Sequence, residues 1–269
     1  MKLSEFAKSI LENGDIESKL VSTDSIEFDD WKPYTLEAPV RDEKIGFSHE
    51  QLRFPRGHFH EIKKRAMALN AFANHELLAV EIMAYALLLF KHDTPEEIRF
   101  KKGILSSLKD EQKHFCLYRK RLNDFGYEFG DFPLNDFFWD HMKKMKTPSE
   151  YLSMMALTFE AANLDFAYHY EKVFRDLGDI ETADVLKIVY EDEISHVAFG
   201  VNYLNKFKED KRLWDYYLSV LPEPLTPARS KGKIFHRESR KRARLDDDFL
   251  KELESFKNDF SILERKSWK

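Results

Sequence analysis

The chain contains the motif Asp-Glu-x-x-His twice, beginning at Asp110 and at Asp192. A Glu and a His three residues apart on a helix are separated by about 300° of rotation and about 4.5 Å of rise, so both side chains reach one point. Each motif also follows, by 33–35 residues, a glutamate in an apolar stretch. Four carboxylates and two imidazoles are the ligand set of a carboxylate-bridged dimetal centre in a four-helix bundle. The six predicted metal ligands are Glu76, Glu111, His114, Glu160, Glu193 and His196.

The repetition of the motif carries this prediction, because a lone Glu-x-x-His is expected about once by chance in a chain of this composition. A single buried Glu–His pair is more often a structural hydrogen bond than a metal site. Two divalent ions and four carboxylates neutralise each other inside an apolar bundle, where isolated carboxylates are costly. Mixed Glu and His ligands with open positions suit iron or manganese better than structural zinc. We therefore expect two metal ions, both iron, with a manganese–iron pair as the alternative.

The metal ligand from the first long helix is an open choice. Glu81 follows Glu76 by five residues, about 140° around a helix and about 7.5 Å along its axis. Glu76 lies level with Glu111 in an antiparallel hairpin, so Glu76 is favoured and Glu81 is the alternative. Four further side chains are expected to border the predicted ligands or to form hydrogen bonds with them: Asp110, Asp192, Asn163 and Tyr190. For Tyr190, a position in the hydrophobic core is an equal alternative. The residues expected outside the ligand set are Asp165, placed beside the ligands or at the surface, and His75, His141 and His169.

Four long helices would hold these ligands, and the sequence marks where they begin and end. Thr94-Pro95 and Thr147-Pro148, each followed by acidic residues, are start signals in which Thr caps the helix and Pro occupies its first turn. Gly126 and Gly178 are end signals. Residues 126–147, rich in aromatic side chains, are expected to form a long crossover with one short helix. The four predicted helices cover residues 58–90, 95–125, 148–177 and 179–208.

Two helical hairpins joined by a long crossover have the connectivity of ferritin-like bundles, in contrast to a simple up-down bundle. We therefore predict an all-α, ferritin-like four-helix bundle with extended N- and C-terminal arms. The long arms and the aromatic crossover are expected to form a substrate pocket. Further helices are expected at the N-terminus, at 214–221 and at 246–263. The predicted domains are an N-terminal helix and arm (1–56), the bundle (57–209) and a C-terminal arm with a basic segment and a terminal helix (210–269).

The composition argues against several classes of protein. Of the 269 residues 43% are hydrophobic and only 9 each are Gly and Pro, which favours long helices over a turn-rich β fold. A net charge of −5 argues against a general nucleic-acid-binding protein. The longest apolar run, residues 82–90, is about half a membrane span, so no membrane insertion is expected. The single cysteine, Cys116, excludes an internal disulfide, suits a cytoplasmic location and is expected to be buried and inert.

Residues 229–244 contain eight Lys or Arg and one acid, Glu238. Such a basic run could dock a phosphate-bearing substrate or RNA. The favoured interpretation is a solvated arm that lies across an acidic bundle.

Four stretches surround the predicted ligands: His75-Glu76-Leu77-x-Ala79-x-Glu81, Asp110-Glu111-x-x-His114, Leu157-Thr158-Phe159-Glu160-Ala161-Ala162-Asn163-Leu164-Asp165 and Asp192-Glu193-Ile194-x-His196-Val197-Ala198-Phe199-Gly200. They resemble a bacterial ferritin-like family known only as a domain of unknown function, and the resemblance covers residues 50–245. It implies a ferritin-like four-helix fold with dimetal ligands at the six positions, and no particular substrate. More distantly, the pattern is similar to the diiron hydroxylase of hypermodified tRNA adenosine and to rubrerythrin-type proteins. The cysteine-rich iron site of rubrerythrin is absent, which argues against a rubredoxin-coupled peroxidase.

Three functions follow from this pattern. The leading hypothesis is an oxidoreductase that activates O₂ at a diiron centre to hydroxylate or oxidise a small molecule or a modified RNA, with an external electron donor. The first alternative is a ferroxidase or a peroxide- or iron-handling protein. The arms would cover the surfaces that a ferritin cage needs, so a monomer or dimer is expected. The second alternative is a non-enzymatic or RNA-binding scaffold.

Overall fold

The structure, a computed structural model, describes residues 1–48, 50, 54–55, 57–232 and 234–258. Throughout these residues the regular secondary structure is helical, apart from two isolated β-bridges. The predicted all-α class is therefore confirmed for the described part of the chain.

The chain divides into two compact units that do not follow the order of the sequence. Unit 1 consists of Met1–Lys144 and Asp176–Val185, and unit 2 consists of Met145–Arg175 and Leu186–Lys269. Each unit therefore contains one copy of the Asp-Glu-x-x-His motif and one of the two upstream glutamates.

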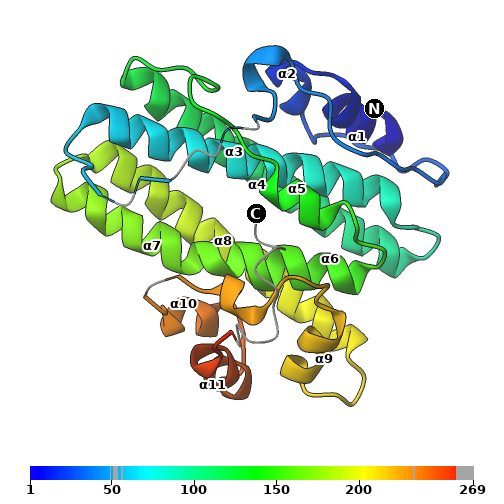
Figure 1. Cartoon of the computed structure of the whole chain (residues 1–269). Coiled ribbons are helices and arrows are strands. Elements are labelled where there is room, and N and C mark those ends of the chain that lie inside the picture. Colours follow the sequence, from blue (N-terminus) through cyan, green and yellow to red (C-terminus); the bar gives the residue numbers. More distant parts are fainter. Residues whose placement is uncertain (49, 51–53, 56, 233, 259–269) are drawn as a thin grey trace. The chain divides into compact units, whose positions relative to one another are not determined.

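The framework of unit 1 is a hairpin of two long helices, α3 (Ile62–Leu89) and α4 (Pro95–Asp124), which lie side by side (Figure 1). Helix α4 begins with a capping box, in which the Thr94 hydroxyl accepts a hydrogen bond from the Glu97 backbone N–H at 3.2 Å and the Glu97 carboxylate accepts one from the Thr94 backbone N–H at 2.8 Å. The predicted start of α4 is thus confirmed. Helix α3 begins four residues later than predicted, after His58, whose φ of +61° does not fit a helix.

The N-terminal arm packs on this hairpin through α1 (Leu3–Glu12), which contacts α3. The amphipathic sequence of α1 explains the contact, because its apolar residues all fall on one buried face: Leu3, Phe6, Ala7, Ile10 and Leu11. The arm continues through α2 (Ile16–Lys19) and the 3-10 turn η1 (Glu43–Ile45).

Two indole N–H groups fix the extended parts of unit 1. Trp31 donates to the Leu88 carbonyl at the end of α3 at 2.9 Å. Trp139 lies in the predicted short crossover helix, α5 (Phe137–Met142), and donates to the Glu37 carbonyl of the arm at 2.7 Å. Both bonds join segments that are distant in sequence, so arm, crossover and hairpin form one unit.

The first long helix of unit 2 changes its hydrogen-bond pattern in the middle. Helix α6 (Pro148–Met154) leads into the π-helical segment η2 (Met155–Glu160) and then into α7 (Ala161–Asp176). Within this segment the Thr158 hydroxyl donates to the Ser153 carbonyl, five residues earlier, at 2.7 Å. The sequence predicted an uninterrupted α-helix over the same stretch, so the π-helical segment was missed.

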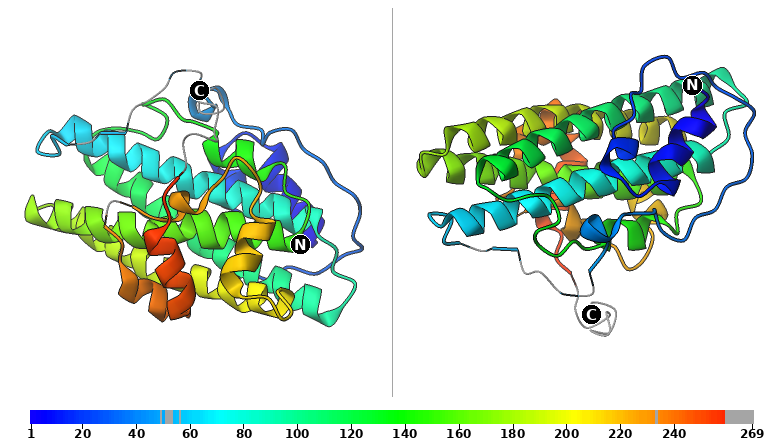
Figure 2. Two further views of the ribbon diagram at one scale, coloured as in Figure 1. Left: turned by 60° about the horizontal axis from the view of Figure 1, so that its bottom comes forward. Right: turned by 90° about the horizontal axis from the view of Figure 1, so that it is seen from above.

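The part of α8 (Ile180–Phe207) that belongs to unit 2 lies beside this helix (Figure 2). Gly200 permits the close approach, because a Cβ at this position would lie 2.3 Å from the Ala156 Cβ and 3.0 Å from the Leu157 Cδ1. Any larger residue would push α8 away from the π-helical segment.

The described residues of the C-terminal arm of unit 2 form four short helical elements: α9 (Leu213–Val220), the 3-10 turn η3 (Pro227–Ser230), α10 (Arg237–Arg242) and α11 (Asp247–Ser255). The Trp214 ring packs edge-on against Phe249, with 5.2 Å between ring centroids, and this contact joins α9 to α11. The predicted helix over 246–263 is too long, because α11 ends at Ser255. Residues 259–263 of that prediction lie outside the described residues.

One described helix, α3, is long and apolar enough to cross a membrane by length and composition. However, 83% of its most apolar window is buried inside the protein, as in the core helix of a soluble protein. Length and composition are therefore weak evidence for a membrane span here.

Candidate metal centre

Unit 1 brings three predicted ligands together on its helical hairpin. Glu76 of α3 and Glu111 and His114 of α4 each offer one ligand atom, and these atoms lie within 4.8 Å of one another. All three side chains are buried, with at most 4% of their surface exposed. The His114 Nδ1 lies 3.3 Å from the Glu111 Oε2, as expected for a Glu and a His one turn apart. We call these three residues half-site 1.

Unit 2 holds a second group of the same composition. Glu160, the last residue of η2, and Glu193 and His196 of α8 offer ligand atoms that also lie within 4.8 Å of one another. These side chains are buried to a similar degree. The His196 Nδ1 lies 3.4 Å from the Glu193 Oε2. We call these three residues half-site 2.

Each half-site has the donor set of a metal site. Two carboxylates close together in a buried position repel each other when both are ionised, and isolated buried carboxylates are costly. A divalent cation would neutralise such a pair. Two oxygen donors and one imidazole leave coordination positions open, and this donor set suits iron or manganese. The residues present in each half-site therefore fit a bound metal ion.

The π-helical segment ends on a predicted ligand. Glu160 is the final residue of η2. A π turn contains more residues than an α turn, so it rotates the side chains that follow the turn around the helix axis, relative to a regular α-helix. Such segments are rare and are frequent at functional sites. Thr158 supports the segment from a second side, because its hydroxyl also lies 2.8 Å from the buried Tyr217 hydroxyl. Sequence periodicity alone gave no signal of this feature.

Asn163 lies beside the predicted ligand Glu193. Its side-chain N–H donates to the Glu193 Oε1 at 2.8 Å. This bond holds the Glu193 carboxylate of half-site 2 in one orientation.

The other residues expected near the ligands have partners of their own. Asp110 is half-buried and pairs with Lys113 at 3.2 Å, and Asp192 is also half-buried. Their proposed bonds to the imidazoles stay predictions. The Tyr190 hydroxyl lies 3.3 Å from the His236 Nδ1. Burial raises the pKa of Tyr190.

Glu81, the alternative ligand, is buried in a separate network of ion pairs. Its carboxylate accepts hydrogen bonds from the Arg41 Nε at 3.0 Å and Nη2 at 2.7 Å, and its Oε1 lies 3.1 Å from the Lys19 Nζ. Arg41 also donates to the Asn74 side-chain oxygen at 2.9 Å. Burial lowers the pKa of Lys19, and the Glu81 carboxylate opposes that shift. The structure therefore places Glu76 in half-site 1 and gives Glu81 two cationic partners from the N-terminal arm.

Asp165 is buried rather than at the surface, where one of the two sequence alternatives placed it. Its carboxylate accepts bonds from the Arg240 Nη1 at 2.6 Å and Nη2 at 3.0 Å. The backbone N–H groups of Gly232 and His236 donate to the same carboxylate at 2.8 and 2.7 Å. Asp165 thus holds the C-terminal arm on α7, a role that its sequence position did not indicate.

Other side chains of the basic segment 229–244 also face acids of unit 2. Arg237 pairs with Asp247 at 3.1 Å and with Glu254 at 2.8 Å. Arg242 pairs with Glu191 of α8. These contacts match an arm that lies across acidic residues.

The remaining candidates fall outside the half-sites. His75 stacks on Phe138, the His141 Nδ1 lies 2.8 Å from the Phe137 carbonyl and His169 contacts the Tyr170 ring. The prediction that Cys116 is buried is wrong, because its side chain is exposed. Two positions along α4 turn it about 200° away from His114, toward the surface.

A family model described as "Protein of unknown function (DUF455)" matches residues 3–251. A curated protein of Haemophilus influenzae, described as uncharacterized, is 27% identical over 155 residues, which cover 55% of this chain and 53% of that protein, so the match spans about half the length of the relative. No solved structure matches the chain. The family model includes both half-sites and most of both arms, and the chain belongs to the DUF455 family of proteins of unknown function.

Proposed function

We propose that half-site 1 and half-site 2 together hold two iron ions in a ferritin-like four-helix bundle. We further propose that the protein is an oxidoreductase that uses O₂ to hydroxylate or oxidise a small-molecule substrate, with electrons from an external donor. One observation carries the proposal: each unit buries the same trio of two carboxylates and one imidazole, with the ligand atoms within 4.8 Å of one another.

The elements that supply the ligands support the bundle. Half-site 1 comes from the α3–α4 hairpin, and half-site 2 comes from the α6–η2–α7 helix and α8. A crossover that contains α5 connects the first hairpin to the second. This order of helices and this distribution of ligands are those of ferritin-like dimetal proteins.

The charge of the ligand set supports metal binding rather than a structural role. Four buried carboxylates would carry a large uncompensated charge, whereas two divalent ions balance it. Bound iron would supply O₂ activation at its open coordination positions. The protein's own residues would bind and orient the ions: Glu111 and Glu193 each beside an imidazole, Asn163 through its bond to Glu193, and η2 through the position of Glu160.

Metal analysis of the full chain tests the site. Protein loaded with iron(II) under anaerobic conditions is expected to retain two iron ions per chain. The variants Glu111→Ala and Glu193→Ala, one in each half-site, are expected to lose iron. Glu181→Ala is the matched control, because Glu181 lies on α8 and its side chain is 78% exposed. The dimetal site would be contradicted if the wild type retained less than one iron ion per chain. Equal iron retention by the wild type and all three variants would also contradict it.

Oxygen uptake tests the chemistry. With a reductant present, an oxidoreductase is expected to consume O₂ over many turnovers. A ferroxidase would consume O₂ only in proportion to the iron added. Gel filtration adds a second criterion, because a multimer of about twenty subunits would favour iron storage and a monomer or dimer would favour the oxidoreductase.

A further inference from the structure

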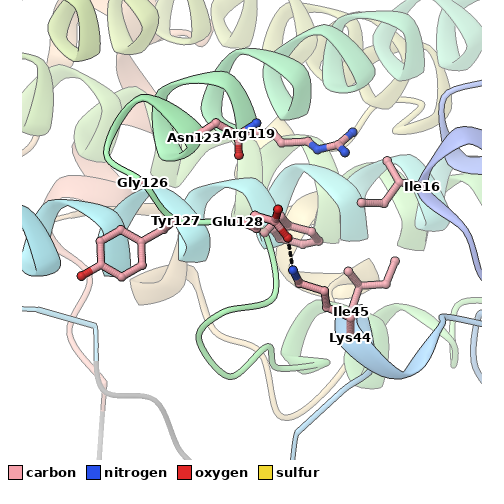
Figure 3. A pocket seen from close by; sticks show the side chains of 9 residues that line it. Ile16, Lys44, Ile45, Arg119, Asn123, Gly126, Tyr127 and Glu128 are labelled. Carbon is pink, nitrogen blue, oxygen red and sulfur yellow. Dashed lines mark hydrogen bonds and ion pairs between the residues drawn. The ribbon is translucent and has the colours of Figure 1, made fainter.

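A pocket in unit 1 lies where the sequence placed a substrate pocket, between the N-terminal arm and the crossover. It has a volume of about 460 Å³ and opens to solvent (Figure 3). Ile16 and Ile45 of the arm and Phe129 of the crossover line its apolar part. The end of α4 supplies polar groups, Arg119 and Asn123, which lie one turn apart. This volume is in the range of small-molecule sites, and the lining combines charged and polar side chains with a smaller apolar part.

Arg119 is the available cation of this pocket. Among the described residues it makes no hydrogen bond and no ion pair, and Figure 3 draws its guanidinium without a partner. The other basic group, Lys44, is already paired with Glu128 and lies 3.6 Å from Asp131. A free guanidinium offers a planar pair of donors that matches a carboxylate.

Close packing fixes the wall between the arm and the crossover. Gly130 has a φ of +94°, and a Cβ at this position would lie 2.2 Å from the Lys44 carbonyl oxygen. The Gly130 backbone N–H donates to the side-chain oxygen of the buried Asn70 at 3.0 Å. Phe129 packs edge-on against Phe115, with 5.1 Å between ring centroids. The pocket is therefore held open by the fold, which lowers the entropy lost on binding.

We propose that this pocket binds a small monoanion, a carboxylate on an apolar body. The carboxylate pairs with the Arg119 guanidinium and accepts a hydrogen bond from Asn123, and the apolar body lies on Ile16, Ile45 and Phe129. A monoanion fits the residues that line the pocket, because Lys44 is paired with Glu128 and Asp131 and Arg119 is the cation that faces a ligand. A phosphate dianion would meet the negative charges of Glu128 and Asp131.

This binding site does not depend on the metal centre. Arg119 follows Glu111 by eight residues, which places it about 12 Å further along α4 and about 80° around the helix. Substitutions at Arg119 therefore leave half-site 1 intact, and the site can be tested with or without iron.

A matched pair of probes tests the proposal by isothermal titration calorimetry on the full chain. 2-Naphthoate carries the carboxylate, and 2-naphthamide has the same body without the charge. Wild type is expected to bind one naphthoate. Its affinity for the amide is expected to be lower by about ten-fold or more. Arg119→Gln is expected to reduce naphthoate affinity about ten-fold, as for the loss of a charged hydrogen bond, and to leave amide affinity unchanged.

Unchanged amide affinity in Arg119→Gln excludes misfolding, and two further variants test general charge effects and the wall of the pocket. Lys120→Gln removes the same charge from the adjacent, exposed residue of α4 and is expected to bind naphthoate like wild type. Gly130→Ala disturbs the wall at Lys44 and is expected to weaken both probes. The proposal is overturned if wild type does not bind naphthoate at millimolar concentration, if acid and amide bind equally, or if Arg119→Gln and Lys120→Gln behave alike.

Discussion

The side-chain N–H of Asn163 on α7 donates a 2.8 Å hydrogen bond to the Glu193 Oε1 on α8. Glu193 also lies beside His196 in half-site 2. Asn163 therefore links the two helices of unit 2 at the carboxylate that we propose to be a metal ligand. An uncharged donor at this place orients the carboxylate and leaves its charge available to a cation.

Replacement of Asn163 by Ala is expected to weaken iron binding about ten- to hundred-fold, because the carboxylate of Glu193 loses the bond that orients it. Competition with a chelator measures the affinity. Asn202→Ala is the control, since Asn202 lies on the same helix as Glu193 but is exposed. Equal affinities in wild type and Asn163→Ala would contradict the orienting role.

Glu76 and Glu81 are expected to respond in opposite ways to substitution. Glu81→Ala leaves Lys19 and Arg41 buried without their shared carboxylate, and is expected to destabilise the metal-free protein by about 3–5 kcal/mol. Glu76→Ala removes one of two clustered carboxylates and is expected to reduce iron binding with a smaller loss of stability. Urea unfolding and metal analysis of both variants provide the two measurements.

The comparison is decisive because each variant serves as the control for the other. If Glu81→Ala lost its iron while its stability stayed at the wild-type value, Glu81 would replace Glu76 as the proposed ligand from α3.

Much of the fold was predictable because its signals are local. Thr94 and Thr147 cap their helices as predicted, and Gly126 has the positive φ expected after a helix. The π-helical segment was not predictable, because its support is distant in sequence. Gly200 of α8 permits close packing on it, and Tyr217 of α9 bonds to it.

In the candidate site, too, local spacing was predictable and contacts between residues distant in sequence were not. The helical spacing of Glu111 and His114, and of Asn163 relative to Glu160, was sufficient to predict which side chains lie together. Spacing favoured Glu76 over Glu81 as a ligand but left the choice open. It depends on Lys19 and Arg41, which lie in an arm without sustained periodicity, so no pattern in the sequence pointed to them.

The ion pair between Asp165 and Arg240 is expected to stabilise the C-terminal arm. Asp165→Ala leaves the Arg240 guanidinium buried and unpaired, and removes the acceptor of two backbone N–H groups. A loss of about 3–5 kcal/mol is expected in urea unfolding. The double variant Asp165→Ala with Arg240→Ala is expected to lose less than the sum of the two single variants, Asp165→Ala and Arg240→Ala, because it leaves no unpaired charge. Additive losses would show that the two side chains do not act together.

Lys101 of α4 is expected to make the stability of unit 1 depend on pH. Its ammonium is buried, donates to the Leu87 carbonyl at 2.7 Å and lies 2.7 Å from the His92 Nδ1. Burial lowers the pKa of Lys101 to about 8, against the opposing effect of nearby acids. Between pH 8 and 10.5 the unfolded chain therefore binds more protons at this residue than the folded chain. The free energy of unfolding contributed by Lys101 accordingly rises with pH across that window, by roughly 3 kcal/mol in all.

Urea unfolding of wild type and Lys101→Met between pH 7 and pH 10.5 measures this contribution, because other titrating groups affect both proteins equally. The wild type is expected to gain stability relative to Lys101→Met as the pH rises, with most of the change above pH 8. Lys102→Met is the control, since Lys102 is exposed on the same helix and is expected to follow the wild-type curve. Parallel curves for wild type and Lys101→Met would mean that Lys101 keeps the same affinity for its proton in the folded and unfolded chains, and that burial against Leu87 and His92 does not lower its pKa.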